Sequence, residues 1–233
     1  MDFLQRYSMT MPQLATKSKV GCLLAFCLLS LTLLCSCKEK QSENDQVYGV
    51  DLSHHNTVED WDKVTASFVY LKATEGESHQ DDKFRSFAKR AKQQEIAVGA
   101  YHFMTTSSSA KNQFENFYRE VKGVKLDLLP VLDIERQTKG YPVSKEKLRS
   151  EVRVFVELSK KHFGKAPIIY CSQPFYTKYF LGHFDDCKYW CGDVDCPAVL
   201  PHVMHQKTIK HVPAIKGKVD YNVLNCKLDD IKL

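Results

Sequence analysis

The sequence predicts an α/β protein, an irregular TIM-like (β/α) barrel with about eight strands and incomplete helices in its C-terminal part. The first observation is that apolar segments of strand length alternate with amphipathic segments of helix length from residue 47 onward. The second is that helical segments become scarce after residue 172 while strand-like segments continue. The third is that nearly every strand-like segment ends in polar or aromatic residues, as expected where loops converge over the mouth of a barrel.

Residues 1–46 differ in character from the rest of the chain. Val20–Leu34 is an apolar run of fifteen residues, too short for a typical membrane span and suited to the core of a signal peptide. The run closes with Leu34-Cys35-Ser36-Cys37, which resembles the lipobox of bacterial lipoproteins. That resemblance implies a signal peptide over residues 1–36 and lipidation of Cys37; an ordinary secretory signal and an uncleaved anchor are the alternatives. Residues 37–46 are charged and polar, which predicts a flexible tether.

Residues 47–233 are expected to form one domain that begins with regular alternation. Strands are predicted at 47–53, 68–74, 96–104 and 128–134, each a short apolar run. A short amphipathic piece over 58–64 and helices over 81–94, 110–122 and 144–163 separate or follow them. The helix assignments depend on apolar residues at helical spacing, such as Phe84, Phe87, Ala88 and Ala91. The later strands are predicted at 168–172, 189–192, 203–207 and 219–223.

The net charge argues against a nucleic-acid partner. The chain carries +5, of which residues 1–36 contribute +2 through Asp2, Arg6, Lys17 and Lys19, leaving +3 for residues 37–233. This balance is too weakly basic for nucleic acid, and basic and aromatic residues do not interleave. It is compatible with an anionic polymer such as cell wall.

The nine cysteines divide between the two parts of the chain. Four of them belong to the signal region: Cys22, Cys27, Cys35 and Cys37. Five remain in the domain: Cys171, Cys187, Cys191, Cys196 and Cys226. Export permits disulfides, and we expect a locally stapled loop around Trp190, although the connectivity stays open. A zinc site from the middle three with His202 and His205 is a weaker alternative, because the Cys-x-x-Cys spacing is missing. We therefore expect no metal and no cofactor.

One strand carries a pair of acids. The segment Leu129-Pro130-Val131-Leu132-Asp133-Ile134-Glu135 places Asp133 and Glu135 two residues apart, so in a strand both point to the same face. Two adjacent carboxyls repel when both are ionised, so one tends to keep its proton and can act as a general acid. Glycoside hydrolysis requires such a pair, whereas a solvated acidic turn is the alternative reading.

Other predicted strands also bring carboxylates or aromatic residues to the same rim. The segments are Gly49-Val50-Asp51-Leu52-Ser53, Lys72-Ala73-Thr74-Glu75-Gly76, Gly99-Ala100-Tyr101-His102-Phe103, Ile169-Tyr170-Cys171-Ser172, Tyr189-Trp190, His205-Gln206 and Val219-Asp220-Tyr221-Asn222. Gathering carboxylates at one rim is electrostatically unfavourable, which indicates substrate binding or proton transfer there.

In this order the segments resemble the glycoside hydrolase family 25 lysozymes, the Chalaropsis-type muramidases, over nearly all of residues 47–233. The resemblance implies that Glu135 is the general acid and that Asp133 tunes it and orients the substrate's N-acetyl group. It implies that Asp51 and Asp220 complete an acidic floor. The remaining implied substrate contacts are Tyr101, Tyr170, Trp190, Glu75 and Gln206.

Three positions depart from the family pattern, and several residues have structural alternatives. Asn56 stands where Gln is usual, Thr57 where Gly is usual and His205 where Trp is usual, which affects the sugar subsites more than the chemistry. Asp51 could be a turn residue, and Glu75 could pair with Lys72. His102 is expected to be a core or supporting residue, and Tyr170 and Trp190 could be core aromatics. His54 and His55 are expected to face opposite ways, which disfavours a shared metal.

The resemblance implies a peptidoglycan hydrolase, a lysozyme that cleaves the β-1,4 bond between N-acetylmuramic acid and N-acetylglucosamine. A covalent and a neighbouring-group intermediate both remain open. The alternatives are a cell-wall-binding lipoprotein with little turnover and a same-fold hydrolase of another N-acetylhexosamine polymer. The expected partners are peptidoglycan glycan strands and a bacterial membrane, outer membrane or cell surface, reached through lipidated Cys37. We expect a monomer, and the sequence leaves open whether its target is the cell's own wall or a foreign one.

Overall fold

The computed structural model describes residues 46–195 and 197–233. The predicted signal peptide, Cys37, nearly all of the predicted tether and Cys196 lie outside these residues. Within the described part, no helix combines the length and apolar character needed to cross a membrane.

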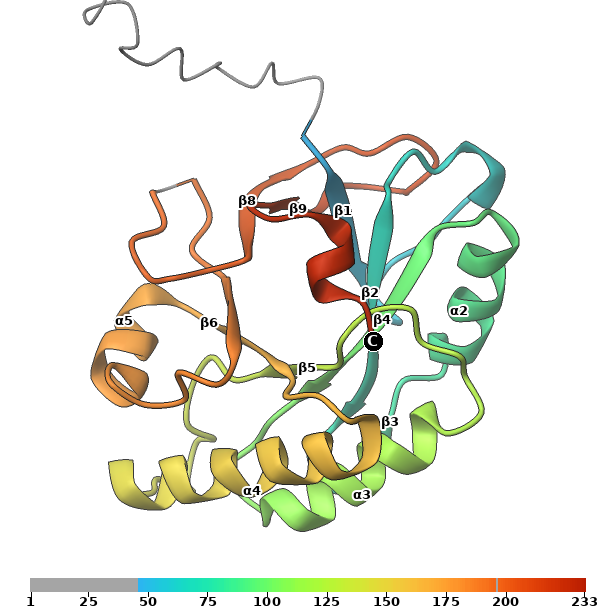
Figure 1. Ribbon diagram of the computed structural model, residues 1–233. Helices are drawn as coiled ribbons and strands as arrows, with labels where there is room; N and C mark the ends of the chain where they lie inside the picture. The colour runs from blue at the N-terminus through green and yellow to red at the C-terminus, as the bar shows by residue number, and fades with distance from the viewer. Residues whose placement is uncertain (1–45, 196) are drawn as a thin grey trace, which may run out of the picture. The chain divides into compact units, whose positions relative to one another are not determined.

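Eight strands close into a barrel, which confirms the predicted fold class (Figure 1). The strands in barrel order are β1 (Tyr48–Leu52), β2 (Phe68–Glu75), β4 (Ala97–Phe103), β5 (Val131–Asp133), β6 (Ile168–Cys171), β7 (Lys188–Cys191), β8 (Met204–Lys210) and β9 (Val219–Leu224). β9 then pairs with β1 and closes the ring. A ninth, two-residue strand, β3 (His79–Gln80), folds back on the end of β2 and was not predicted.

The last strand departs from the parallel arrangement that a TIM-like barrel implies. The six pairings from β1 through β8 are parallel, but β9 is antiparallel to both β8 and β1. The connection from Lys210 to Val219 is too short for the crossover that a parallel pair needs, so the chain turns back as a hairpin. Consequently the start of β9, not its end, lies at the mouth of the barrel.

Three helices cover the first half of the barrel, close to their predicted bounds (Figure 1). They are α2 (Phe84–Gln93), α3 (Ala110–Val121) and α4 (Lys145–Phe163). The hydroxyls of Ser109 and Ser144 accept hydrogen bonds from the first turns of α3 and α4, and Gly164 ends α4 with a left-handed φ of 76°. The short pieces are α5 (Gln173–Phe175) with the π-helical turn η3 (Tyr176–Phe180), and the 3₁₀ turns η2 (Trp61–Lys63) and η4 (Leu228–Ile231).

Two apolar clusters follow from the alternation of side chains along the strands. In β2, Val69 and Leu71 point outward into the larger cluster, which the helices cover. Phe68 and Tyr70 point inward and join a separate cluster that fills the barrel. Ile231 of η4 belongs to this inner cluster and is fully buried, and the backbone N–H of Leu129 donates to its carbonyl. The barrel therefore has a packed base.

Two glycines make room for the rings inside the barrel. A Cβ atom on Gly49 would lie 2.3 Å from the ring of Phe68, and one on Gly99 would lie 2.1 Å from the ring of Tyr70. Both separations are far below a van der Waals contact. Glycine at these positions is thus a packing requirement of the two large inward-facing rings.

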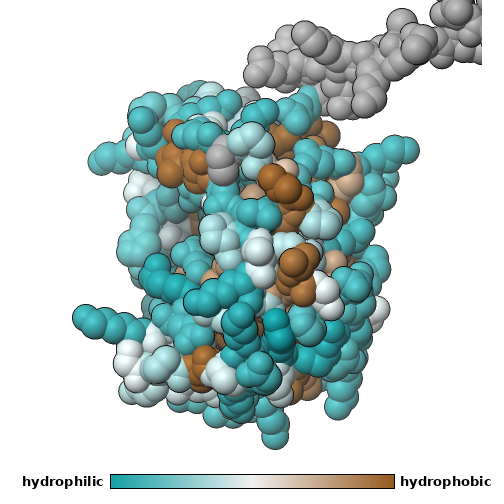
Figure 2. Space-filling model, turned by 90° about the vertical axis from the view of Figure 1, so that its left-hand side faces the viewer, coloured by the Kyte–Doolittle hydropathy of each residue, from teal (hydrophilic) through white to brown (hydrophobic). Residues whose placement is uncertain are grey.

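The described surface exposes few large hydrophobic side chains: Tyr141, Val154, Leu181, Val199, Ile209 and Leu233. Figure 2 shows the face that lies on the left in Figure 1, where hydrophobic residues form separate patches on a mostly hydrophilic surface. A polar surface of this kind suits contact with hydrated polymers more than burial in an apolar partner.

Candidate active site

The predicted acids meet in one cavity at the mouth of the barrel. The cavity has a volume of about 250 Å³ and is lined by Asp51, Ser53, His55, Lys72, Tyr101, Phe103, Val131, Asp133, Glu135, Tyr170, Trp190, Gln206 and Asp220. All four acids that the sequence singled out as catalytic are therefore brought together, from β1, from β9 and from β5 with the residues that follow it.

The alternation of β5 places the acid pair as predicted. Leu132 and Ile134 are fully buried in the outer cluster, while Asp133 and Glu135 line the cavity. Asp133 is the last residue of β5 and is only 8% exposed. Glu135 lies two residues further on, where its side chain is 40% exposed and its Oε2 is 3.7 Å from a guanidinium nitrogen of Arg136. One acid is thus held in the barrel and the other stands at its rim.

Asp51 and Asp220 face each other across β1 and β9. They are register partners, so the reversed direction of β9 brings Asp220 to the mouth from the start of its strand. Asn222 Nδ2 donates to Asp51 Oδ2 over 2.7 Å, and Gln206 Nε2 donates to Asp220 Oδ1 over 2.8 Å. Gln206 Oε1 accepts from the Tyr170 hydroxyl over 2.7 Å. These amides orient the two carboxyls and tie them to neighbouring strands.

The cavity favours protonated carboxyls. Burial, followed by the charge of Asp220, raises the pKa of Asp51 to about 8, against the opposing hydrogen bond from Asn222. Burial, followed by the charges of Glu135 and Asp51, raises the pKa of Asp133 well above its usual range. The pKa of Asp220 is also raised by burial, while its hydrogen bond from Gln206 lowers it. Protons are therefore held inside this site near neutral pH.

Among the residues that line the cavity, two buried polar atoms have no hydrogen-bond partner in the described part of the chain. They are Asp133 Oδ1 and Trp190 Nε1. A buried polar group without a partner is unfavourable by roughly 1–3 kcal/mol. Because both residues line the cavity, a bound molecule can supply the missing partners.

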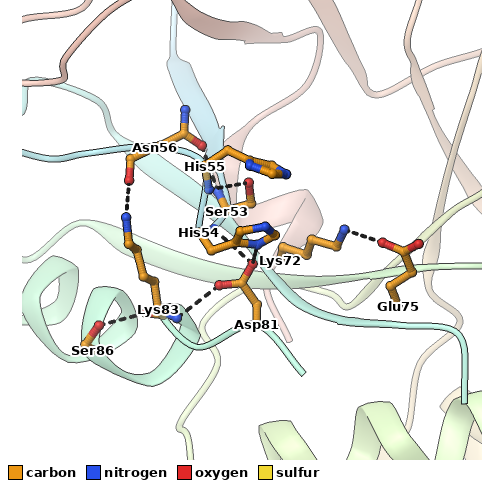
Figure 3. A network of polar contacts seen from close by, with 9 residues as sticks. All are labelled: Ser53, His54, His55, Asn56, Lys72, Glu75, Asp81, Lys83 and Ser86. Atoms are coloured by element: carbon orange, nitrogen blue, oxygen red, sulfur yellow. Dashed lines mark hydrogen bonds and ion pairs between the residues drawn. The ribbon is translucent and has the colours of Figure 1, made fainter. Parts of the chain in front are cut away.

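The loop after β1 is held by a polar network (Figure 3). The buried carboxylate of Asp81 accepts from the backbone N–H of His54 over 2.9 Å and lies 2.7 Å from His54 Nδ1. The rings of His54 and His55 lie against each other with centroids 3.8 Å apart and planes tilted by 45°, so the expectation that they face opposite ways is wrong. The reason is that β1 ends at Leu52 and the chain turns, with Asn56 N donating to Ser53 O. This turn delivers His55 to the cavity.

The three aromatic residues predicted to stack on sugars differ in exposure. Tyr101 and Tyr170 are partly exposed and line the cavity. Trp190 is only 2% exposed, and the rings of Tyr70 and Tyr170 lie 5.3 Å and 5.0 Å from it. Trp190 is therefore mainly a core residue that forms the floor of the cavity, and Tyr101 and Tyr170 offer more ring surface at the mouth.

Glu75 and His102 have structural roles: Glu75 pairs with Lys72, and His102 lies in the core. Lys72 Nζ lies 2.6 Å from Glu75 Oε2, and Glu75 is not among the residues that line the cavity. His102 is fully buried, with Nδ1 2.8 Å from the Thr74 hydroxyl and Nε2 3.1 Å from Gln113 Oε1. Burial lowers the pKa of His102 to about 4, so it remains a neutral core residue.

Five cavity residues were missed as site residues: Ser53, His55, Lys72, Phe103 and Val131. For three of them the signal was present, because Ser53 follows Asp51, Phe103 follows Tyr101, and Lys72 follows Tyr70 by two residues on the same face of a strand. Lys72 brings a cation to the acids and lowers the pKa of Asp133 against the larger effect of burial. His55 depends on the turn after β1, which alternation does not predict.

The departures from the family pattern lie beside the cavity. Asn56 Oδ1 accepts from Ser53 N, and its carbonyl accepts from Lys83 Nζ, as Figure 3 shows. His205 does not line the cavity; its Nε2 lies 2.8 Å from the carbonyl of Asp193. Both residues support loops at the mouth.

Within the described residues, no disulfide forms the stapled loop that was expected around Trp190. Cys171, Cys187 and Cys226 are free thiols. A bond between Cys191 and Cys196 would involve a residue outside the described ranges. No group of three or more His, Cys, Asp or Glu residues in 46–195 and 197–233 is placed to hold a metal ion.

The other hollows hold fewer of the acids. A hollow of about 1010 Å³ lies against β8 and β9 and includes Asp195 as its only carboxylate. Another, of about 590 Å³, adjoins the central cavity at Glu135. Among the hollows formed by residues 46–195 and 197–233, only the central cavity combines several carboxyls with raised pKa values, so the chemistry is assigned there.

Comparison with known proteins agrees with this geometry. The model of the family described as glycosyl hydrolases family 25 matches residues 50–208, a range that includes Asp51, Asp133 and Glu135 and stops before Asp220. Lysozyme M1 of Streptomyces globisporus is 33% identical over 139 residues, covering 55% of this chain and 47% of its own.

Two solved structures share the fold. The bacterial lysozyme from Streptomyces coelicolor superposes with a TM-score of 0.74 at 27% identity, covering 81% of this chain and 96% of its own. A family 25 glycosyl hydrolase from Bacillus anthracis superposes with a TM-score of 0.73 at 28% identity, covering 81% and 93%.

Proposed function

Because the chain belongs to glycosyl hydrolases family 25 and is a glycoside hydrolase of the lysozyme type, we propose that it cleaves peptidoglycan between N-acetylmuramic acid and N-acetylglucosamine. The names of the similar lysozymes support peptidoglycan as the substrate. The β-1,4 bond and the roles of individual residues are part of the proposal.

The proposal depends on one observation: the cavity places the buried carboxyls of Asp51 and Asp133, whose pKa values are raised, beside the exposed carboxyl of Glu135. Glycoside hydrolysis needs an acid that reaches the glycosidic oxygen and a polar group that supports positive charge at the anomeric carbon. Glu135 stands at the rim, so it can reach an oxygen of a long polymer lying across the mouth. Glu135 is therefore proposed as the general acid.

The buried acids take supporting roles in this proposal. Asp133 Oδ1 has no partner in the described part of the chain and lines the cavity beside Glu135, so the acetamido group of a bound sugar can pair with it. The negative charge of Glu135 disfavours ionisation of Asp133 and helps to raise the pKa of Asp133. Asp51 and Asp220 form the floor on the opposite strands. Tyr101 and Tyr170 offer ring faces to the sugar C–H groups.

The test is digestion of purified peptidoglycan by the 233-residue chain in detergent, with reducing ends identified by mass spectrometry after borohydride reduction. We expect muramitol ends. Glu135→Gln should lower the rate about 10²–10⁴-fold, because it keeps the shape of the side chain and removes the transferable proton. Glu115→Gln, an exposed change on α3, is the matched control and should retain the parent rate.

Other outcomes would contradict separate parts of the proposal. Glucosaminitol ends would contradict the assigned bond. An undiminished rate for Glu135→Gln would contradict the assigned acid. No products from any variant, on walls of several compositions, would favour a cell-wall-binding protein with little turnover, and cleavage of a chitin-like polymer alone would favour the other N-acetylhexosamine substrate.

We also propose that the mature protein is a monomer exported and anchored to a bacterial membrane through lipidated Cys37. The support is the apolar run of residues 20–34 followed by a lipobox-like segment. Several acyl chains hold a protein on a membrane where one does not. A Cys37→Ala variant should leave the membrane fraction on cell fractionation; retention there would contradict the anchor.

A further inference from the structure

A second hollow opens beside the proposed acid. Its volume is about 590 Å³, and Glu135 lines both this hollow and the central cavity, so the two adjoin at that residue. Arg136 and Gln137 line one side of it, and Phe175, Lys178 and Tyr179 of α5 and η3 line the other. A substrate that places its scissile bond at Glu135 would therefore extend into this hollow.

The walls of the hollow are fixed to each other. Gln137 Nε2 donates to the Tyr179 hydroxyl over 3.3 Å and to the carbonyl of Val143 over 3.0 Å. Val143 N donates back to Gln137 Oε1 over 2.8 Å, and Arg149 Nε donates to the carbonyl of Tyr179 over 2.6 Å. The hollow is thus a formed feature of the fold, because hydrogen bonds join the segment after β5 to η3.

The hollow is positively charged. Arg136 and Lys178 are both exposed in it, and its only acid is Glu135 itself. The Arg136 guanidinium lies 3.7 Å from Glu135. Lys178 Nζ lies 5.0 Å above the ring of Tyr179 and has no carboxylate within ion-pair distance in residues 46–195 and 197–233. An ammonium group without an acid partner in the described residues, beside the cavity of the candidate active site, is suited to an anionic ligand.

We propose that this hollow binds a carboxylate carried on the lactyl side arm of muramic acid, with Lys178 as its ion-pair partner and Arg136 beside it. The inference rests on the proposed function. In the proposed substrate only the muramic acid residues carry such an arm, and its carboxyl is either free or joined to a peptide that has carboxylates of its own. A site for this group distinguishes muramic acid from N-acetylglucosamine, so Lys178 is a specificity-determining residue.

The experiment compares three soluble substrates with the whole chain in detergent. The first is peptidoglycan with its peptides; the second is glycan stripped by an amidase, with free lactyl carboxylates; the third is the same glycan with those carboxylates converted to methylamides. We expect Lys178→Gln to raise KM about five- to tenfold on a carboxylate-bearing substrate and to leave kcat unchanged, because Arg136, and not Lys178, is paired with Glu135. On the methylamide glycan it should match the parent.

The substrates on which Lys178→Gln raises KM identify the source of the carboxylate. A KM increase on the first substrate assigns the peptide carboxylates, and one on the second assigns the lactyl carboxylate. Arg136→Gln is expected to lower kcat on all three as well, because its guanidinium contacts Glu135. Lys161→Gln removes an exposed charge from α4 and should leave every constant at the parent value.

Equal constants for Lys178→Gln and the parent on all three substrates would overturn the inference, and so would equal losses on all three. Failure of the parent to release muramic acid ends from any substrate would instead overturn the proposed function. The two failures are therefore distinguishable.

Discussion

At the base of the barrel the inward-facing side chains include Phe68, Ile168 and Met204, all fully buried, whereas further along the same strands they are Lys72, Tyr170 and Gln206. Both sets follow from the same alternation, because every second residue of a strand points inward. The base is closed by η4, and its cluster contains no carboxyl side chain among the described residues. The mouth is open and contains four carboxyls.

The comparison teaches where stability and chemistry reside in this fold. Burying apolar rings at the base is favourable in proportion to the area removed from water. Burying acids at the mouth is unfavourable, and the raised pKa values of Asp51 and Asp133 record this, since both acids take up protons to avoid a buried charge. We therefore expect changes at the base to lower stability and changes at the mouth to lower activity while sparing or raising stability.

The largest effect on stability is expected at Phe68. Phe68→Ala removes a fully buried ring that packs edge-on against Tyr70 and leaves a cavity, so the free energy of unfolding should fall by about 3–5 kcal/mol. Phe103→Ala is the matched change at the mouth, where the ring is partly exposed, and its loss should be about 1 kcal/mol. Urea unfolding followed by circular dichroism measures both.

Equal losses for the two phenylalanine variants would contradict the division between base and mouth. So would a loss at Phe103 larger than the loss at Phe68. The activity of the remaining folded fraction sharpens the test, because only the Phe103 variant changes a residue that lines the cavity.

Much of this division could be predicted from the sequence. The period-two pattern around Asp133 and Glu135 placed both acids on one face, and the order of the segments placed Asp51 at the same rim. The covering helices were found because Phe84, Ala88 and Ala91 repeat at helical spacing and are indeed buried. Local periodicity is strong where one face of an element is apolar.

Other parts of the site could not be predicted, because they depend on features that the periodicity of apolar residues does not encode. Asp220 reached the mouth although its strand runs in the opposite direction, since strand direction is set by the length of a connection and not by the pattern within the strand. The contact between the rings of His54 and His55 depends on a turn held by Asp81, which lies 27 residues after His54 in the chain. The pairing of Glu75 with Lys72 follows a bulge in the register between β2 and β4.

A smaller effect, and the one most specific to the mouth, is expected for Asp51→Asn. Asn222 can still donate to the oxygen of the new amide, so the geometry is kept while the titration is removed. In the parent the folded pKa of Asp51 is about 8, above its usual value, so the folded state binds a proton that the unfolded chain releases from about pH 4 upward. The free energy of unfolding therefore falls as pH rises between about 4 and 8, by at most about 1.4 kcal/mol per pH unit from this group.

Replacing the Asp51 carboxyl by an amide should reduce this fall in the free energy of unfolding with pH. Measured by urea unfolding, Asp51→Asn should gain on the order of 2 kcal/mol relative to the parent between about pH 5 and pH 8, while turnover on peptidoglycan falls. Asp60→Asn is the control of opposite sign: hydrogen bonds lower the pKa of Asp60, so its contribution is lost only as pH falls through the acid range, and its offset should stay constant between these two pH values. A constant offset for Asp51→Asn as well would mean that Asp51 does not hold a proton in the folded state, and the energetic contrast between mouth and base would lose its main support.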